Sequence, residues 1–176
     1  MKRIFILVVL ISAFLQAFGQ EPVAANKYGF SFETPKGWIL TEEFDSINNT
    51  TSLLLGADTT YKPGIVITPA FELSILALGD TIANARVFAD YYLSNMESSI
   101  DGFKATAPIT KVEISGKSAY KIEAVFTNYG VEEHVVSFVF DIKKGVVQSI
   151  NFIDFESKYN TNKLVFDAFL NSIKFN

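Results

Sequence analysis

Histidine chemistry in this chain rests on one residue, because His134 is the single histidine among the 176 residues. Glu132 lies two positions earlier, so the two side chains would share one face of a strand. A Glu-x-His pair can supply two metal ligands or an acid–base couple. The sequence offers no third ligand, and a surface histidine near a hairpin end is the ordinary alternative. We therefore assign no metal, cofactor or catalytic residue and keep Glu132 and His134 as weak candidates.

Acidic side chains form a second set that could bind a metal. The candidate calcium ligands are Glu42, Glu43, Asp45, Asp154 and Glu156. Calcium-binding loops space their oxygens as in Asp-x-Asp-x-Asp-Gly, and no stretch of this chain has that spacing. Solvated loop charge is the preferred interpretation of these residues.

Motifs for nucleophilic or phosphate chemistry are absent from the sequence. The chain has no cysteine, which excludes cysteine nucleophiles and zinc thiolate sites. It has no Gly-x-Ser-x-Gly elbow, no Gly-x-Gly-x-x-Gly loop and no Gly-Lys-Ser/Thr. Asn48 and Asn49 begin two overlapping Asn-x-Thr sequons, which matter only where the host glycosylates asparagine.

The first nineteen residues have the pattern of a secretory signal peptide. Lys2 and Arg3 precede an apolar run over Ile4 to Leu15, and Ala17-Phe18-Gly19 offers small residues for cleavage. Without cysteine there is no lipobox, and no later stretch is long and apolar enough to span a bilayer. We expect a periplasmic or extracellular, soluble protein without a lipid anchor. Cleavage would change the net charge from −4 to −6, which gives no electrostatic reason to bind nucleic acid.

The elements that must position these side chains centre on a predicted four-stranded meander over Ile109 to Ile153. Three turns contain a glycine, at Ser115-Gly116, Tyr129-Gly130 and Lys144-Gly145. If Tyr129-Gly130 is a two-residue turn, Val135 pairs with Ala124, Val136 pairs with Glu123, and Glu123 lies diagonal to His134. The strand that contains His134 is apolar on both faces, which predicts a sheet covered on both sides.

Two helices are predicted to cover that sheet. The first runs from Ile82 to Ile100 after an Asp80-Thr81 cap, with one apolar stripe. The second runs roughly from Lys158 to Ser172 and buries Tyr159, Phe166, Phe169 and Ile173. Further strands are expected at Phe30–Phe32, at Ser52–Leu55 between polar loops, and in the run Ile65–Leu78 with a break near Pro69.

Two short motifs resemble the PsbP-like and DcrB-like exported domains. The first is a strand with alternating aromatics followed by Pro35-Lys36-Gly37-Trp38, and the second is the tail Ser172-Ile173-Lys174-Phe175 after the final helix. Together they cover under a fifth of the chain. The resemblance implies an α+β fold, an α/β/α sandwich around an antiparallel sheet, over residues 28–176 after a short polar lead-in at 20–27. It implies little about activity, since the family is functionally scattered and mostly non-enzymatic.

The absence of catalytic sets favours a non-enzymatic accessory domain that binds a protein partner at the cell envelope. Exposed aromatics such as Tyr61, Tyr91 or Tyr129 are the natural contact points. The alternative is a small apolar-ligand or lipid carrier with a cavity between helix and sheet. A second alternative is an enzyme of unrecognised type, for which a solvent-open pocket with converging polar side chains, preferably including His134, would be the discriminating observation.

Overall fold

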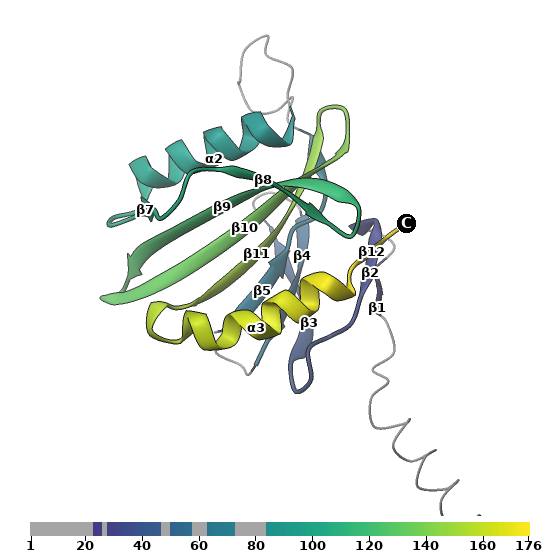
Figure 1. Cartoon of the computed structure of the whole chain (residues 1–176), viewed down its shortest axis with the longest axis horizontal. Helices are drawn as coiled ribbons and strands as arrows, with labels where there is room; N and C mark the ends of the chain where they lie inside the picture. The colour runs from purple at the N-terminus through teal and green to yellow at the C-terminus, as the bar shows by residue number, and fades with distance from the viewer. Residues whose placement is uncertain (1–22, 26–27, 47–49, 58–62, 73–83) are drawn as a thin grey trace, which may run out of the picture.

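The computed structural model describes residues 23–25, 28–46, 50–57, 63–72 and 84–176, and a nine-stranded antiparallel sheet is its central feature (Figure 1). The strands are β3 (Ile39–Asp45), β4 (Thr50–Gly56), β5 (Gly64–Ile67), β6 (Phe71–Glu72), β7 (Lys104–Ala105), β8 (Thr110–Ile114), β9 (Lys117–Asn128), β10 (Val131–Lys143) and β11 (Val146–Phe155). Their order is β3-β4-β5-β11-β10-β9-β7, with β6 paired to β11 and β8 paired to β9.

The predicted meander is confirmed as β8 to β11, which follow one another in sequence as antiparallel neighbours. Gly116, Gly130 and Gly145 have φ values of 81°, 79° and 76°, as the turn predictions require. The register of the β9–β10 hairpin is also as predicted, with Val135 opposite Ala124.

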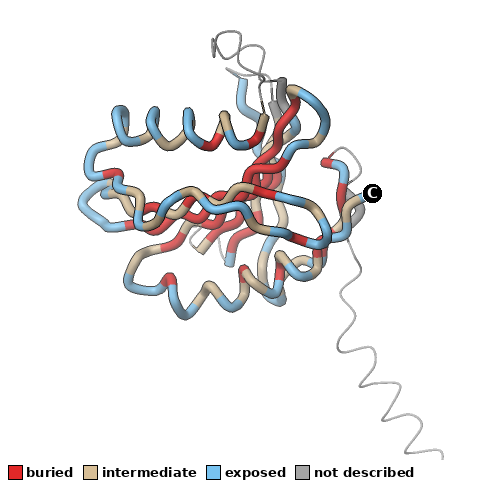
Figure 2. The backbone as a smooth tube through the Cα atoms, turned by 45° about the horizontal axis from the view of Figure 1, so that its top comes forward, coloured by how far each residue is buried: buried red, intermediate tan, exposed pale blue. Residues whose placement is uncertain are grey.

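Strand β10 explains why the sheet is covered on both sides. All residues from Glu133 to Phe140 are buried, so neither face of the strand meets solvent. The even positions from Val136 to Phe140 pack in the cluster that includes α3 (Glu156–Ser172), whereas Val135 and Val139 pack toward α2 (Ala85–Ser99). The two helices therefore lie on opposite faces, and Figure 2 shows the buried strands running between them.

Helix α2 begins at Ala85, and its N-cap is Asn84 rather than the predicted Asp80-Thr81, which lies outside the described residues. The Asn84 side chain accepts a hydrogen bond from the backbone N–H of Val87 at 3.0 Å. Asp141 accepts a second from the N–H of Ala85 at 2.7 Å, which ties the helix start to β10. The predicted stripe is confirmed, with Ala85 and Ala89 buried and the larger apolar residues of the stripe partly buried.

Helix α3 follows β11 without a connecting loop. It begins at Glu156, two residues earlier than predicted, because the strand runs on to Phe155. The predicted buried stripe is confirmed, since Tyr159, Phe166, Phe169 and Ile173 are all nearly inaccessible. The ring of Phe166 stacks on that of Phe152 in β11 with centroids 4.7 Å apart, and the Tyr159 ring lies 5.9 Å from the same phenylalanine.

The first described strands and the last strand of the chain meet in a separate three-stranded sheet. It consists of β1 (Val23–Ala25), β2 (Phe30–Phe32) and β12 (Lys174–Phe175), with β2 in the centre. Phe30 and Phe32 are buried as predicted. The centroid of the Phe175 ring lies 5.7 Å from the centroid of Phe30 and 5.5 Å from that of Phe140. Part of the predicted polar lead-in is thus strand β1.

Strand β3 was missed, because its stretch was expected to be a polar loop. Residues Ile39–Asp45 form the edge strand of the sheet and are mostly exposed, so their sequence lacks the apolar alternation of a half-buried strand. The predicted break near Pro69 is confirmed, since β5 ends at Ile67 and β6 begins at Phe71. Within the described residues, no helix has the length and hydropathy needed to span a bilayer.

Candidate functional site

His134 is buried between β9, β10 and the first turn of α3. His134 is 7% exposed, so the expectation of a surface histidine is wrong. Both ring nitrogens face carboxylates, with Nδ1 2.5 Å from Glu156 Oε2 and Nε2 3.3 Å from Glu123 Oε1. Because a neutral imidazole carries one N–H, both contacts are hydrogen bonds only when the ring is doubly protonated.

Tyr159 closes the cluster from the helix side. Its ring stacks on that of His134 with centroids 3.6 Å apart and planes 1° from parallel. Its hydroxyl donates to Glu123 Oε1 at 3.3 Å, and Lys121 Nζ lies 2.6 Å from Glu123 Oε2. The four groups Lys121, Glu123, His134 and Glu156 therefore form a charge-balanced chain when the imidazole is protonated.

The surroundings in the cluster shift the pKa of two of its members, Glu123 and Tyr159. Burial would raise the pKa of the Glu123 carboxyl, but Lys121 and His134 together lower it below the ordinary value. Burial, and after it the charge of Glu123, raises the pKa of the Tyr159 hydroxyl. The folded protein thus holds Glu123 ionised and Tyr159 neutral over the physiological pH range.

The contacts of His134 join secondary-structure elements of the fold to one another. Glu132 is exposed, and the contacts of His134 run to Glu123 and Glu156 instead. Among the described residues, no group of three His, Asp or Glu side chains has a geometry that could hold a metal ion. Three cavities formed by described residues, of about 410, 390 and 290 Å³, are lined by residues other than His134. The cluster instead connects the start of α3 to the two long strands.

The acidic candidates for calcium are not brought together. Glu42, Glu43 and Asp45 are near neighbours along the exposed edge strand β3. Asp154 is fully buried and not a solvated loop charge, because it accepts hydrogen bonds from Asn162 Nδ2 and from the N–H of Phe155, both at 2.8 Å. The sequon residues Asn48 and Asn49, like Tyr61, lie outside the described residues.

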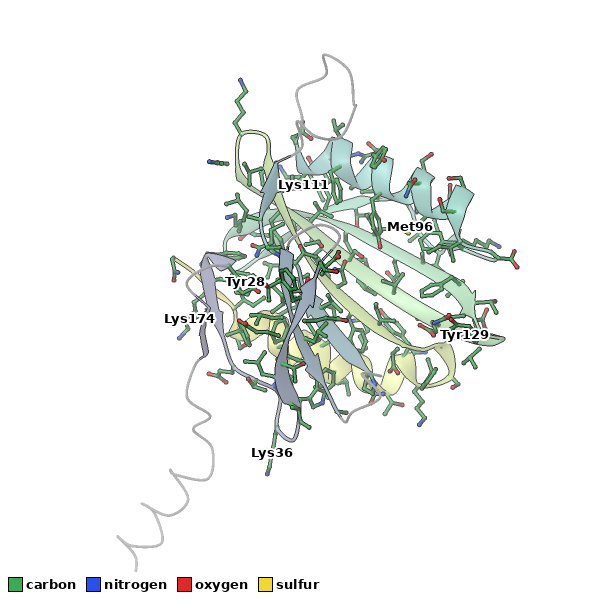
Figure 3. The ribbon with its side chains drawn as sticks, turned by 180° about the vertical axis from the view of Figure 1, so that it is seen from behind. Tyr28, Lys36, Met96, Lys111, Tyr129 and Lys174 are labelled. Atoms are coloured by element: carbon green, nitrogen blue, oxygen red, sulfur yellow. The ribbon has the colours of Figure 1, made fainter. Side chains whose placement is uncertain are left out.

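Tyr129 is the most exposed large hydrophobic residue among the described residues, at 101%. It occupies the tip of the β9–β10 hairpin, where Asn128 pairs with Val131 and leaves the two-residue loop Tyr129-Gly130. Tyr129 has φ 48° and Gly130 has φ 79°, the sign pattern of a type I′ turn. Figure 3 shows Tyr129 at the edge of the molecule, far from Lys174 at the other end. Tyr91, the other predicted contact residue that is described, is 39% exposed on α2.

Sequence reasoning found part of the His134 cluster. The hairpin register placed Glu123 diagonal to His134, and the structure confirms that position. Glu156 and Tyr159 were missed as partners, although Tyr159 was correctly expected to be buried. Their contact depends on where α3 starts and how it crosses the sheet, and no local pattern in the sequence carries that information.

No family model and no curated protein sequence matches the chain. Among solved structures, cyanobacterial PsbP from Synechocystis is 16% identical with a TM-score of 0.61, over 89% of this chain and 92% of that one. LpqN from Mycobacterium tuberculosis, a protein involved in cell envelope biogenesis, is 15% identical with a TM-score of 0.57, over 88% of each chain.

A third similar structure comes from Bacteroides thetaiotaomicron. It is 12% identical with a TM-score of 0.51, and the match covers 84% of this chain but 45% of that protein. At these identities the likeness concerns the fold. The antiparallel sheet, the helix on each face and the similarity to cyanobacterial PsbP confirm the predicted resemblance, and the chain has the PsbP-like α+β fold.

Proposed function

We propose that this protein is an exported, non-enzymatic accessory domain that binds a protein partner at the cell envelope, with the tip of the β9–β10 hairpin as its contact point. The observation that supports the proposal is the conformation of Tyr129. Type I′ turns favour Asn, Asp or Gly at this position, because other residues are strained at positive φ by roughly 1 kcal/mol. A tyrosine that is fully exposed there gains no packing energy to offset the strain.

The rest of the hairpin suits a role in presenting this side chain. Strands β9 and β10 have 12 and 13 residues, and ten residue pairs join them. The His134 cluster and α2 hold the two strands from opposite faces, so the tip has a rigid base. Val131, 45% exposed, lies two residues after Tyr129 and adds apolar surface. Tyrosine is enriched in the residues that contribute most to protein–protein binding energy.

Two further considerations support the cellular setting. Residues 1–19 have the composition of a signal peptide, which would place the folded domain outside the cytoplasm. LpqN, which shares the fold, is involved in cell envelope biogenesis. Both suggest a partner in the envelope.

The proposal is tested by affinity capture from an envelope fraction with quantitative mass spectrometry. Three baits are compared: the wild-type protein, the Tyr129→Asn variant and the Ser115→Asn variant. Ser115 has φ 49° in the β8–β9 turn, so the second variant makes the same turn substitution without removing an aromatic ring. We expect a reproducible partner with wild type and Ser115→Asn, and its loss with Tyr129→Asn. No reproducible partner, or equal capture by all three baits, would contradict the proposal.

A further inference from the structure

A cavity of about 290 Å³ lies between α2 and the odd face of the sheet. Its described lining comes from the loop after β5, from α2 and from the two central strands. These residues are Thr68, Phe88, Tyr92, Ser137, Val139, Ser149 and Asn151. The volume corresponds to about ten water molecules and lies near the lower end of the range of small-molecule sites.

Ser137 is the most informative residue of the lining. It lies in the middle of β10, in a run of eight buried positions, and is 2% exposed. Its Oγ makes no hydrogen bond of acceptable geometry with any described residue. A buried hydroxyl without a partner is uncommon and costs free energy, so a group that occupies the cavity is expected to satisfy it.

Two more polar groups line the cavity, the hydroxyl of Tyr92 and the side-chain amide of Asn151. Burial raises the pKa of the Tyr92 hydroxyl, and the nearby Ser137 hydroxyl offsets this rise only in part. Asn151 uses Nδ2 as a donor to Ser149 Oγ at 3.1 Å and to the carbonyl of Val66 at 3.4 Å. Its Oδ1 accepts no hydrogen bond from the described residues. The cavity therefore offers a hydroxyl of Ser137, a hydroxyl of Tyr92 and an amide oxygen of Asn151.

The remaining polar side chains hold the lining in place. Thr68 Oγ1 accepts a hydrogen bond from the N–H of Ser149 at 2.9 Å. The same oxygen lies 3.2 Å from the carbonyl oxygen of Ser149 and 3.2 Å from the Oγ of Ser149. In the register, Ser137 pairs with Asn151 and Val139 with Ser149, so the polar atoms come from adjacent positions on one face. Phe88 and Tyr92, four residues apart on α2, add aromatic surface with centroids 6.0 Å apart.

We infer that this cavity binds a neutral polyhydroxylated molecule of about monosaccharide size. A charged ligand would lack a counter-charge, since the described lining contains no Lys, Arg, His, Asp or Glu. An apolar ligand would leave the buried Ser137 hydroxyl unsatisfied. Ligand hydroxyl groups can donate to Asn151 Oδ1 and can donate to or accept from the hydroxyls of Ser137 and Tyr92, and the C–H faces of a sugar or cyclic polyol can pack on the aromatic rings. This inference is independent of the proposed partner site at Tyr129.

The test measures binding of defined probes to the intact protein by NMR. D-glucose, D-galactose, D-mannose and myo-inositol are the neutral probes, glucuronate is the charged probe, and N-phenyl-1-naphthylamine is the apolar probe. We expect at least one neutral probe to show saturation transfer and to shift the Asn151 side-chain amide signal. Ser137→Ala and Tyr92→Phe should each raise its Kd about fivefold to tenfold, the effect of removing one neutral hydrogen bond.

Controls distinguish ligand contact from damage to the fold. Ser118→Ala removes an exposed hydroxyl of β9, and Tyr129→Asn removes the proposed contact residue, so both should bind the probe like the wild type. The ligand-free Tm of Ser137→Ala should equal or exceed that of the wild type, because the deleted hydroxyl has no protein partner. The inference is overturned if no neutral probe binds, if only glucuronate or only the naphthylamine binds, or if neither cavity variant weakens binding.

Discussion

The ring of His134 is buried, stacked on Tyr159 and placed between two carboxylates, so its removal affects packing and charge together. We predict that His134→Ala lowers the free energy of unfolding by about 2–4 kcal/mol, because Glu123 and Glu156 lose their shared partner and a cavity opens. Glu132→Ala is the matched control, since Glu132 is exposed on the same strand face, and it should change stability by less than about 0.5 kcal/mol. Urea unfolding at pH 7 measures the free energy of unfolding of both variants. Equal effects of the two substitutions would contradict the stabilising role of the His134 contacts.

The lowered pKa of Glu123 predicts a pH dependence with a definite sign. A carboxyl whose pKa is lower in the folded protein stabilises it fully above the pKa of the unfolded chain, about 4.3, and loses that contribution as the pH falls through the folded value. Glu123→Gln should therefore be less stable than the wild type at pH 7, and the difference should shrink at pH 3. Urea unfolding at the two pH values gives the comparison.

Glu113→Gln, an exposed change on β8, controls for the general effect of losing one negative charge. Its unfolding free energy should stay within about 0.5 kcal/mol of the wild type at both pH values. A Glu123→Gln deficit that is the same size at pH 3 as at pH 7 would contradict the ionic role of Glu123.

At the scale of single residues, the sequence predicts what depends on strand register and misses what depends on helix placement. Tyr129-Gly130 fixes the hairpin, and from it the positions of His134 and Glu123 follow. Ser137 illustrates the limit, because its place in an apolar strand was visible whereas its missing partner was not. An unpaired hydroxyl is a property of all the elements around it.

At the scale of elements, the start of α2 depends on Asn84. We predict that Asn84→Ala lowers the free energy of unfolding by about 1 kcal/mol, because the N–H of Val87 loses its acceptor. Asn84→Ser should retain most of the stability, since serine also caps helices. Asn95→Ala, an exposed change in the body of the same helix, should be neutral or slightly stabilising. Thermal unfolding compares the three variants, and equal Tm values for Asn84→Ala and wild type would contradict the capping role.

Strand and helix types were predictable where burial follows a simple period. Strand β10, buried on both faces, and the stripes of α2 and α3 carry that signal in their apolar residues. Edge strand β3 does not, because Glu42, Glu43 and Asp45 are exposed on a strand with one neighbour. The cap of α2 was misplaced because Asp80-Thr81 is as good a local capping signal as Asn84.

At the scale of the whole molecule, Phe175 connects the last strand, β12, to β2 and to β10. Its ring packs on Phe30 and Phe140, and Lys117 Nζ lies 4.8 Å from its centroid. We predict that Phe175→Ala lowers the free energy of unfolding by about 2–3 kcal/mol and speeds amide exchange in β2, which pairs with β12. Phe175→Leu should recover most of the stability. Unchanged exchange at Phe30 and Ser31 would contradict the coupling of β12 to β2.

The sandwich as a whole places the β9–β10 hairpin between two helices and exposes Tyr129 at its tip. The most direct test of the proposed role is site-specific photo-crosslinking in the living envelope, with p-benzoylphenylalanine at position 129 and, as control, at position 115. We predict one discrete adduct with a second protein from position 129 and none from position 115. No adduct from position 129, or the same adducts from both positions, would contradict the proposal that the hairpin tip binds a protein partner.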